Sequence, residues 1–402
     1  MSEAHLDDFR AAARAWLEAN YPPELAENPT SVTAGMIDGA KPTPAVALWR
    51  KRMGEKGWGV PTWPQRYGGG GLSAEEADVL QQEMKRLGAL NPIGGLGMMM
   101  FGPTLLEYGT EEQCARHIPP IARMELRWCQ GFSEPGAGSD LASLQTKAED
   151  KGDHFLVTGQ KVWTTGAQYS DWCFCLVRTS NVGKKHDGIS FLMIDMKSPG
   201  VEVRPIVLIS GESPFCETFF TEVKVPKENL VGPLNGGWTV AKRLLQHERV
   251  STSGASAFKA ERIADLRAMA KSYYGEDENG RIADPDYRAR LTEHLMDERA
   301  FRLTAARAMN DRAGGNNGVS AVSSILKNAG MRVSQTRAEL IVEAMGMQGV
   351  GWEGPQFSET EIASLRAMLH GKAGSIAGGS NEIQNNIIAK RILGLPDPKP
   401  GA

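Results

Sequence analysis

The sequence predicts an α+β protein in which a β-domain lies between two helical domains. The first and last parts of the 402-residue chain repeat apolar residues at helical spacing, whereas the middle part holds short runs of β-branched and aromatic residues. We therefore expect an N-terminal helical domain at 1–125, a middle antiparallel β-barrel or sandwich domain at 126–232, and a C-terminal helical domain at 233–402.

The N-terminal domain alternates predicted helices with turn-rich loops. Residues 6–17 carry apolar side chains at helical spacing, and 60–73, "VPTWPQRYGGGGLS", is a Pro/Gly loop. Ser73 at the end of this loop and Glu76 three residues later form the pattern of a capping box. A helix is therefore expected to begin directly after Ser73.

The middle domain shows strand-like segments such as "HFLVTGQKVWTTG", "WCFCLVRTS" and "GISFLMIDM". Cys173 and Cys175 alternate inside one of them. A metal site would need a second Cys or His pair at matching spacing, which the sequence lacks, so we interpret both as buried strand residues and expect no metal. No strand leads into a G-x-G-x-x-G helix start, which disfavours a Rossmann domain.

The C-terminal domain ends on "SIAGGSNEIQNNIIAKRILGLP", residues 375–396. Gly378 and Gly379 permit a backbone that other residues resist, and Ser380 or Asn381 can cap the helix that follows. A tight polar turn at a helix start is a suitable seat for an anion or a cofactor.

Bulk composition limits which classes of partner and which cellular compartment we expect. Lys and Arg total 45 against 48 Asp and Glu, a net charge of −3 that disfavours nucleic-acid binding. The five cysteines are odd in number and scattered, which favours a reducing compartment. The N-terminus lacks the pattern of a secretory leader, and no apolar run reaches the ~18 residues that span a bilayer. We expect a cytoplasmic protein without a membrane span.

Four strings, in order, resemble motifs of the acyl-CoA dehydrogenase family: "QGFSEPGAGSD" at 130–140, "GQKVWTTG" at 159–166, "VPKENLVGPLNGGW" at 225–238 and "GGSNEIQNNIIAKRILGLP" at 378–396. The resemblance covers nearly the whole chain. It implies a C-terminal four-helix-bundle domain, non-covalently bound FAD, and α,β-dehydrogenation of an acyl-CoA thioester to the trans-2-enoyl-CoA. It also implies an electron-transfer flavoprotein as acceptor and, usually, a tetramer.

The resemblance assigns roles to residues of the first two motifs. Phe132 and Ser133 match positions that donate hydrogen bonds to the flavin ring, and Trp163 matches one that stacks on it. Thr165 matches a hydrogen-bonding position near the hydride-accepting N5, and Ser139 one that contacts the acyl-CoA. Read without the motif, Trp163 would simply be a core aromatic residue of a strand.

At the C-terminal motif, the resemblance places Ser380, Asn381 and Glu382 against FAD. Gly378 stands where many family members carry the catalytic carboxylate. Glycine cannot abstract a proton, but its main-chain N–H can still polarise the thioester carbonyl. The missing side chain also leaves volume that suits a branched, cyclic or bulky acyl group.

A subset of the family places its base on another helix, directly before an arginine. "GWTVAKRLLQHERVS" supplies Glu248, followed by Arg249, which we group with Ser139 and Gly378 as substrate-contacting. Glu248 stands four residues after Leu244, at the edge of an expected buried stripe, where apolar surroundings raise a carboxyl pKa and favour its use as a base. His247 is the rival, but one helical step turns it about 100° away.

Two positions depart from the family pattern. Arg281 is the candidate for an arginine that reaches the FAD of a neighbouring subunit, but the usual Phe-Gly after it is absent. Glu343 replaces a glutamine, and its charge would repel a pyrophosphate. These departures resemble heteromeric members, so a homotetramer and a heterotetramer both stay open, as do a non-catalytic subunit of a heteromeric enzyme and a desulfinase-like flavin-dependent lyase.

Overall fold

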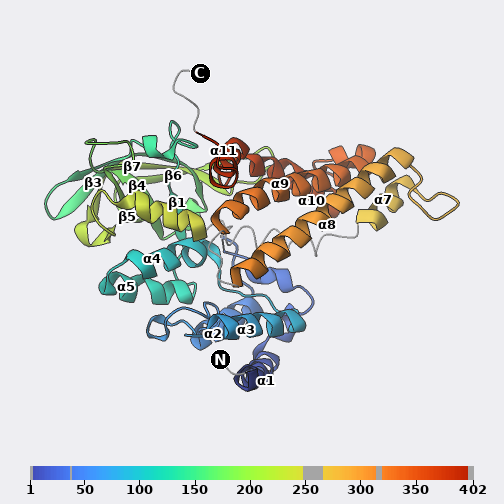
Figure 1. The fold of residues 1–402 in the computed structure, drawn as a ribbon, viewed down its shortest axis with the longest axis horizontal. Helices are drawn as coiled ribbons and strands as arrows, with labels where there is room; N and C mark the ends of the chain where they lie inside the picture. The colour runs from blue at the N-terminus through green and yellow to red at the C-terminus, as the bar shows by residue number, and fades with distance from the viewer. Residues whose placement is uncertain (1–2, 37–38, 248–265, 314–318, 397–402) are drawn as a thin grey trace. The chain divides into compact units, whose positions relative to one another are not determined.

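The computed structural model describes residues 3–36, 39–247, 266–313 and 319–396. Its contacts divide the chain into two compact units. Unit 1 holds residues up to Ile206 and Ser213–His247, and unit 2 holds Val207–Glu212 together with the C-terminal helices. Figure 1 shows both units as ribbons, and each is described by itself below.

Unit 1 begins with helices whose ends follow local sequence signals. They are α1 (Glu3–Asn20), α2 (Pro44–Lys56), α3 (Ala74–Leu87), α4 (Gly102–Tyr108) and α5 (Glu111–Ala122), with a π-helix at Gly97–Phe101 before α4. The predicted capping box is confirmed, because Glu76 N–H donates to Ser73 and Ser73 N–H donates to Glu76 at the start of α3. Gly57 and Gly88 end α2 and α3 with positive φ, as such helix ends require.

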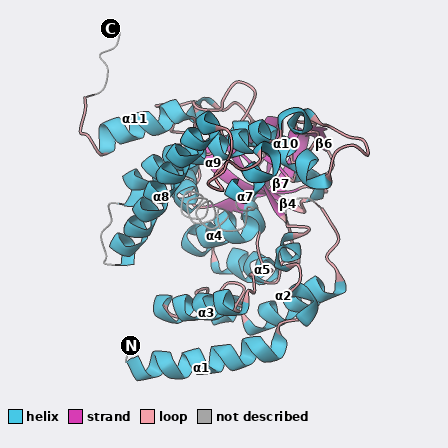
Figure 2. Ribbon diagram, turned by 90° about the vertical axis from the view of Figure 1, so that its right-hand side faces the viewer, coloured by secondary structure: helices cyan, strands magenta, loops and turns pink. Residues whose placement is uncertain are grey.

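The strands of unit 1 form one sheet, drawn in magenta in Figure 2. They are β1 (Trp128–Gly131), β2 (Lys147–Asp150), β3 (His154–Thr165), β4 (Trp172–Arg178), β5 (Ile189–Asp195), β6 (Val201–Ile206), β7 (Phe215–Pro226) and β8 (Leu230–Val231). Their order is β6-β7-β3-β2-β4-β5-β8, with β1 on β4. Long β3 and β7 pair antiparallel from His154↔Pro226 to Thr165↔Phe215, with two register shifts.

The expected order of helical, β and helical regions is confirmed, but the sheet is mixed rather than antiparallel and follows an open path. β1 pairs with β4 in parallel over Trp128↔Trp172 to Gly131↔Cys175, and β2 also meets β4 in parallel. Strands β2 and β3 lie between β1 and β4 in the chain, so the connection is long enough for a parallel pairing. Cys173 and Cys175 are fully buried in β4, as predicted.

One apolar core joins α4 and α5 to the sheet. Phe101 stacks on Trp128 at 4.0 Å between ring centroids and on Phe174 of β4 at 5.4 Å. The same cluster includes Val240 and Leu244 from the helix at residues 237–247. The segment that leads to position 248 is thus packed into the core of unit 1.

Unit 2 contains α7 (Leu266–Tyr274), α8 (Pro285–Ala313), α9 (Val319–Ala344), α10 (Glu359–Gly371) and α11 (Asn381–Arg391). Helix α9 contacts each of the other four, and Figure 1 shows α8, α9 and α10 running alongside one another. The Tyr287 side chain is fully buried and donates to the Leu340 carbonyl at 2.8 Å, which joins α8 to α9. No helix in the described ranges is long and apolar enough to cross a membrane.

His117 of α5 gives unit 1 a pH-dependent weakness. It is 1% exposed between Trp128 and Trp172, and burial, with a smaller effect of Arg116, lowers its pKa to about 4. The unfolded chain protonates this histidine near pH 6.5 and the folded chain does not. Stability is therefore lost as pH falls from about 6.5 to about 4, by up to about 3 kcal/mol.

We expect urea unfolding of His117→Phe to depend less on pH between 7.5 and 5 than that of the wild type. Equal pH dependence in His117→Phe and wild type would show that His117 does not carry the effect.

Candidate functional site

The predicted flavin contacts of unit 1 are brought together by one loop and one strand end. Phe132 and Ser133 directly follow β1, while Trp163 and Thr165 end β3. The Val162 N–H donates to the Ser133 carbonyl at 2.9 Å, so the loop is attached to β3 next to Trp163. Residues about 30 positions apart in the sequence thus form one continuous edge.

A buried ion pair fixes this edge. Lys161 of β3 is fully buried, and its Nζ donates to Glu134 Oε1 at 2.7 Å and to the Phe132 carbonyl at 3.1 Å. Glu134 also accepts from the main-chain N–H groups of Gln145 at 2.6 Å and Thr146 at 2.8 Å. Burial raises the pKa of Glu134, but Lys161 and these hydrogen bonds outweigh burial and hold it below its ordinary value.

The ion pair is the main feature that motif reading missed. Both residues stand inside the quoted motifs, yet no role had been given to either. A lysine inside a strand at a fully buried position requires a carboxylate partner, and that requirement was the available signal.

Trp163 adopts a conformation that ordinary strand residues avoid. Its φ is +60°, at the register shift between Lys161 and Thr164, and its side chain is 56% exposed. Its aromatic neighbour is Phe215, which it meets edge-on at 6.0 Å. A strained backbone that holds a large aromatic ring exposed is typical of a binding surface, and it disfavours the interpretation of Trp163 as a core residue.

Side chains on this edge have free hydrogen-bonding capacity. Among the described residues, the hydroxyls of Ser133 and Thr165 have no hydrogen-bond partner. Together with the exposed Trp163 ring they offer a stacking face and polar groups, which fits a planar heteroaromatic ring. Ser139 lies on the exposed part of the same loop, next to Asp140, which pairs with Lys185 at 2.6 Å.

In unit 2, the glycine turn before α11 has the predicted backbone. Gly378 and Gly379 have φ of +67° and +88°, and Ser380 caps α11 by accepting from the Ile383 N–H. Gln384, which is 2% exposed, donates to the Gly378 carbonyl at 2.8 Å and holds the turn. Sequence reasoning had not identified Gln384.

Asn381 and Glu382 form the first turn of α11. The Asn381 side-chain oxygen accepts from Lys327 of α9 at 3.1 Å, so a half-buried cation lies beside this turn. Burial lowers the pKa of Lys327, and a hydrogen bond from the backbone amide of Glu382 lowers the pKa of that exposed carboxyl. Lys327 is a further group that the motifs did not reveal, because it lies 54 residues before Asn381.

Arg281 and Glu343 each form an ion pair, Glu343 with Arg290 of α8 and Arg281 with Asp277 of the segment before α8. Glu343 pairs with Arg290, which offsets the charge that we expected to repel a pyrophosphate and lowers the Glu343 pKa. Arg281 pairs with Asp277 at 3.0 Å, and Arg288 approaches the same carboxylate at 3.6 Å.

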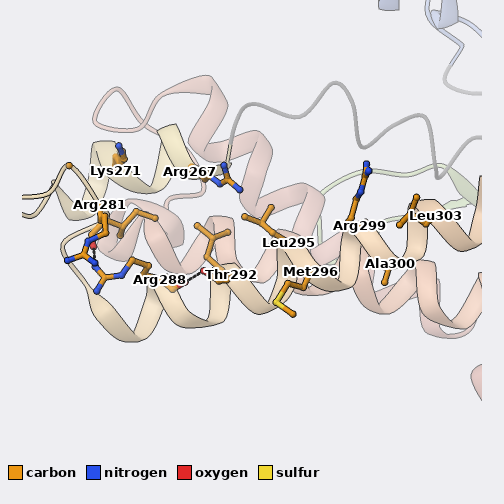
Figure 3. A pocket seen from close by; sticks show the side chains of 13 residues that line it. Arg267, Lys271, Arg281, Arg288, Thr292, Leu295, Met296, Arg299, Ala300 and Leu303 are labelled. Carbon is orange, nitrogen blue, oxygen red and sulfur yellow. Dashed lines mark hydrogen bonds between the residues drawn. The ribbon is translucent and has the colours of Figure 1, made fainter.

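Figure 3 shows Arg281 and Arg288 at one end of a groove of about 720 Å³ along α8, whose apolar lining includes Leu295 and Met296. Residues 248–265, which directly precede α7, lie outside the described residues. We therefore assign the groove no ligand. Glu248 and Arg249 fall in the same stretch, so both predicted site residues lie outside the described residues.

Comparison with known proteins decides the family. The models of the acyl-CoA dehydrogenase N-terminal, middle and C-terminal domains match residues 3–125, 129–223 and 235–393. The chain belongs to the acyl-CoA dehydrogenase family. The "acyl-CoA dehydrogenase IpdE1" of Mycobacterium tuberculosis is 37% identical over 400 residues, covering 97% of this chain and 98% of the relative.

Solved structures of acyl-CoA dehydrogenases share the fold. The "Tcur3481-Tcur3483 steroid ACAD" is 28% identical, with a TM-score of 0.75 and 99% of both chains covered. The "ChsE4-ChsE5 complex from Mycobacterium tuberculosis" is also 28% identical, with a TM-score of 0.73 and the same coverage. Within the described residues of this acyl-CoA dehydrogenase, no group of three or more His, Cys, Asp or Glu side chains could hold a metal ion.

We call the edge formed by Phe132, Ser133, Trp163 and Thr165 the flavin edge, after its predicted ligand, and breaking the buried pair should loosen it. Lys161→Met leaves Glu134 buried without its counter-charge, which typically costs about 3–5 kcal/mol. We expect a lower unfolding midpoint and at least ~10-fold weaker FAD binding, measured by denaturation and by fluorescence titration of the apoprotein. The double variant Lys161→Met/Glu134→Gln should recover part of the stability, because it leaves no unpaired charge.

Glu83→Gln provides the matched control. Glu83 is 3% exposed in the N-terminal helices and bonds Arg14 at 2.9 Å and Arg86 at 2.8 Å. Its loss should lower stability without weakening FAD binding. If both variants weaken FAD binding in proportion to their loss of stability, the Lys161–Glu134 pair has no special role at the flavin edge.

Trp163 should contribute to FAD binding and little to folding. In Trp163→Gly the left-handed conformation no longer costs the ~1–2 kcal/mol of a residue with a side chain, and the ring that is lost is largely exposed. The apoprotein should therefore unfold at an unchanged or higher denaturant concentration, while FAD affinity falls. Trp163→Phe, which keeps a ring, should retain most of the affinity. A strongly destabilised Trp163→Gly apoprotein would favour a structural role.

Proposed function

We propose that this acyl-CoA dehydrogenase binds FAD and converts an acyl-CoA thioester to its trans-2-enoyl-CoA. The observation that carries the proposal is the edge formed by Phe132, Ser133, Trp163 and Thr165, which Lys161 and Glu134 fix from behind. This edge pairs an exposed aromatic face with free hydroxyls, as an isoalloxazine ring requires.

Each residue of the proposed site has a distinct task. The hydroxyls of Ser133 and Thr165 bind ring heteroatoms, Trp163 covers the ring and excludes water, and Glu248 takes the α-proton. The Gly378 N–H donates to the thioester carbonyl, which raises the acidity of the α-carbon. Bound FAD supplies the acceptor, N5, for the β-hydride.

The remaining proposed contacts are made with FAD and with the acyl-CoA. Ser380, Asn381 and Glu382 seat FAD at the start of α11, Arg281 reaches the FAD of a neighbouring subunit, and Glu343 lies near the FAD pyrophosphate. Ser139 and Arg249 contact the acyl-CoA. The hydrogen bond that Asn381 accepts from Lys327 supports its proposed role, because it places a positive charge beside the turn.

A bulky, ring-bearing acyl group is the substrate class that we favour. Gly378 removes a side chain from the turn, whereas Gln384 Nε2 lies where a side chain at Gly379 would begin. A solved relative whose match covers 99% of this chain at 28% identity is named a "steroid ACAD", which supports the same class. Straight short chains would leave this volume unfilled.

A second candidate is that the chain functions as one subunit of a heteromeric dehydrogenase. The ChsE4–ChsE5 relative is a complex of two named components, and Arg281 already holds an intrachain partner, Asp277. We propose a tetramer in the cytoplasm, with an electron-transfer flavoprotein as acceptor. A desulfinase-like lyase is disfavoured because it would not need a base at position 248.

Anaerobic titration of the flavin spectrum tests the proposal. The panel is butyryl-, octanoyl-, isobutyryl- and cyclohexanecarbonyl-CoA and the CoA thioester of a steroid side-chain acid. We expect the ring-bearing thioesters to bleach the wild type most rapidly and to yield enoyl-CoA. Glu248→Gln should still bind FAD but bleach at least ~10²-fold more slowly, because the general base is lost.

Other outcomes separate the alternatives. Undiminished bleaching in Glu248→Gln would contradict the assignment of the base, and bleaching by straight short chains alone would contradict the substrate class. Release of sulfite from an acyl-CoA that carries a sulfino group, added to the panel, would indicate the lyase. A purified chain with less than one FAD per polypeptide, restored by a partner chain, would indicate the heteromeric enzyme.

A further inference from the structure

The loop that carries Ser139 and the turn between β4 and β5 enclose a small basic cavity. Its volume is about 180 Å³, and its lining includes Ser143 of the loop together with Arg178, Lys184, Lys185 and Asp187. All of these residues are described and belong to unit 1. Sites for drug-sized ligands measure about 300–1,000 Å³, so this cavity fits one small group of a ligand rather than a whole ligand.

Arg178 brings a buried positive charge to the basic cavity. It is 7% exposed, and its guanidinium donates to the main-chain carbonyls of Ala142 at 2.7 Å, Lys185 at 3.0 Å and Asp187 at 2.9 Å. Among the described residues no carboxylate forms an ion pair with it. Burial lowers the pKa of Arg178, and the attraction of Glu134 does not offset this effect. A buried cation that only carbonyl dipoles compensate favours an anion in the adjoining space.

The two lysines of the cavity differ in how far their charges are neutralised. Lys185 Nζ lies 2.6 Å from Asp140 Oδ1. Lys184 donates its main-chain N–H to Asp187 Oδ2 at 2.9 Å, while its ammonium group forms no ion pair within the described part of the chain. Since Lys185 and Asp140 neutralise each other, Arg178 and Lys184 face a single carboxylate, Asp187. The cavity therefore keeps one positive charge in excess.

Asp140 connects the basic cavity to the predicted thioester contact. It directly follows Ser139, and its carboxylate accepts from the Ser143 hydroxyl at 2.6 Å and from Lys185 at 2.6 Å. Ser143 and Lys185 both line the cavity. The cavity therefore lies beside the residue that is predicted to contact the acyl-CoA.

We propose that the basic cavity binds a phosphate monoester, the 3′-phosphate of the CoA thioester. The inference rests on the proposed function, in which an acyl-CoA is the substrate. A phosphate monoester carries a charge of about −1.5 to −2 at pH 7 and offers three acceptor oxygens. Among the phosphate groups of CoA the 3′-phosphate alone is a monoester, whereas the diphosphate bridge spreads its charge over two groups. One compact dianion matches a cavity of this size and charge.

The lining residues contribute to phosphate binding in two ways. The Arg178 N–H groups already donate to carbonyls, so Arg178 supplies positive charge rather than a new hydrogen bond. Lys184 Nζ and the Asn181 amide belong to side chains that line the cavity, and they supply N–H donors. Lys184 is the more informative position for substitution, because it is exposed and its loss leaves the Arg178 contacts intact.

Thioesters with and without the 3′-phosphate test the inference on the FAD-loaded protein. The CoA thioester of the panel above that bleaches the wild type most rapidly is compared with its 3′-dephospho-CoA counterpart at one low ionic strength. The readouts are the limiting bleaching rate and the thioester concentration that gives half of it. A change in folding or in the proton-abstracting group affects both thioesters alike. The ratio of the two half-saturating concentrations therefore reports on the 3′-phosphate.

We expect the wild type to require at least ~10-fold more of the 3′-dephospho thioester, because that ligand lacks a charged, hydrogen-bonded group. The limiting bleaching rates of the two thioesters should be equal. Lys184→Gln should lower the ratio at least ~3-fold by weakening only the CoA thioester, and Lys184→Arg, which keeps the charge, should retain most of it. Added salt should also lower the wild-type ratio, because Lys184 is exposed to screening.

Lys197→Gln is the matched control. It removes an exposed lysine of the same unit, whose Nζ lies 3.0 Å from Asp171 Oδ1 and which does not line the cavity, so the wild-type ratio should be kept. Equal half-saturating concentrations of the two thioesters in the wild type would overturn the inference. An equal drop of the ratio in Lys197→Gln and Lys184→Gln would overturn it as well, because the effect would then be one of overall charge.

Calorimetric titration with ligands that carry no acyl group separates the phosphate site from the dehydrogenase chemistry. CoA should bind the FAD-loaded wild type more tightly than 3′-dephospho-CoA does, and Lys184→Gln should reduce this difference. Inorganic phosphate that binds in a Lys184-dependent manner, while CoA and 3′-dephospho-CoA bind equally well, would contradict the assignment to CoA. If no thioester bleaches the flavin but CoA keeps its Lys184-dependent advantage, the phosphate site is supported and the proposed dehydrogenation fails.

Discussion

The flavin edge depends on one buried ion pair. Lys161 and Glu134 belong to segments that would otherwise share only the Val162–Ser133 backbone bond at this point. A fully buried ammonium is tolerated only with a counter-charge, so the loop must close on β3 whenever the strand is formed. Once the sheet has folded, the pair therefore holds Phe132 and Ser133 next to β3. The exposed, strained Trp163 follows two residues after the lysine.

Local signals in the sequence predicted the elements well because the physics behind them is local. The capping box at Ser73 and the cap at Ser380 satisfy helix N–H groups within three residues, and the Gly378 turn needs only a positive φ. The family motifs carried the order of the domains, and they predict flavin contacts for Phe132, Ser133, Trp163 and Thr165. None of these inferences required knowledge of which distant segments meet.

Long-range pairings were not predictable in this way. The parallel contact of β1 with β4 leaves no trace in either strand's own pattern. Glu343 looked repulsive in the sequence because its partner, Arg290, lies 53 residues away. Lys327 beside Asn381 was hidden for the same reason. A charge near a predicted cofactor can be judged only once its partner is known, since pairing decides whether it repels an anion.

The backbone conformation of the glycine turn also limits which position can carry a catalytic base. Gly378 has a φ of +67°, a conformation that costs a residue with a side chain roughly 1–2 kcal/mol, and Gln384 holds the turn through the Gly378 carbonyl. The turn is thus built to present main-chain N–H groups rather than a carboxylate. The helix at 237–247 differs, because its apolar face is buried and Glu107 holds its last described turn. A carboxylate carried by a helix needs no such strained backbone, so the chain can keep glycine at position 378 and supply its proposed base from another segment.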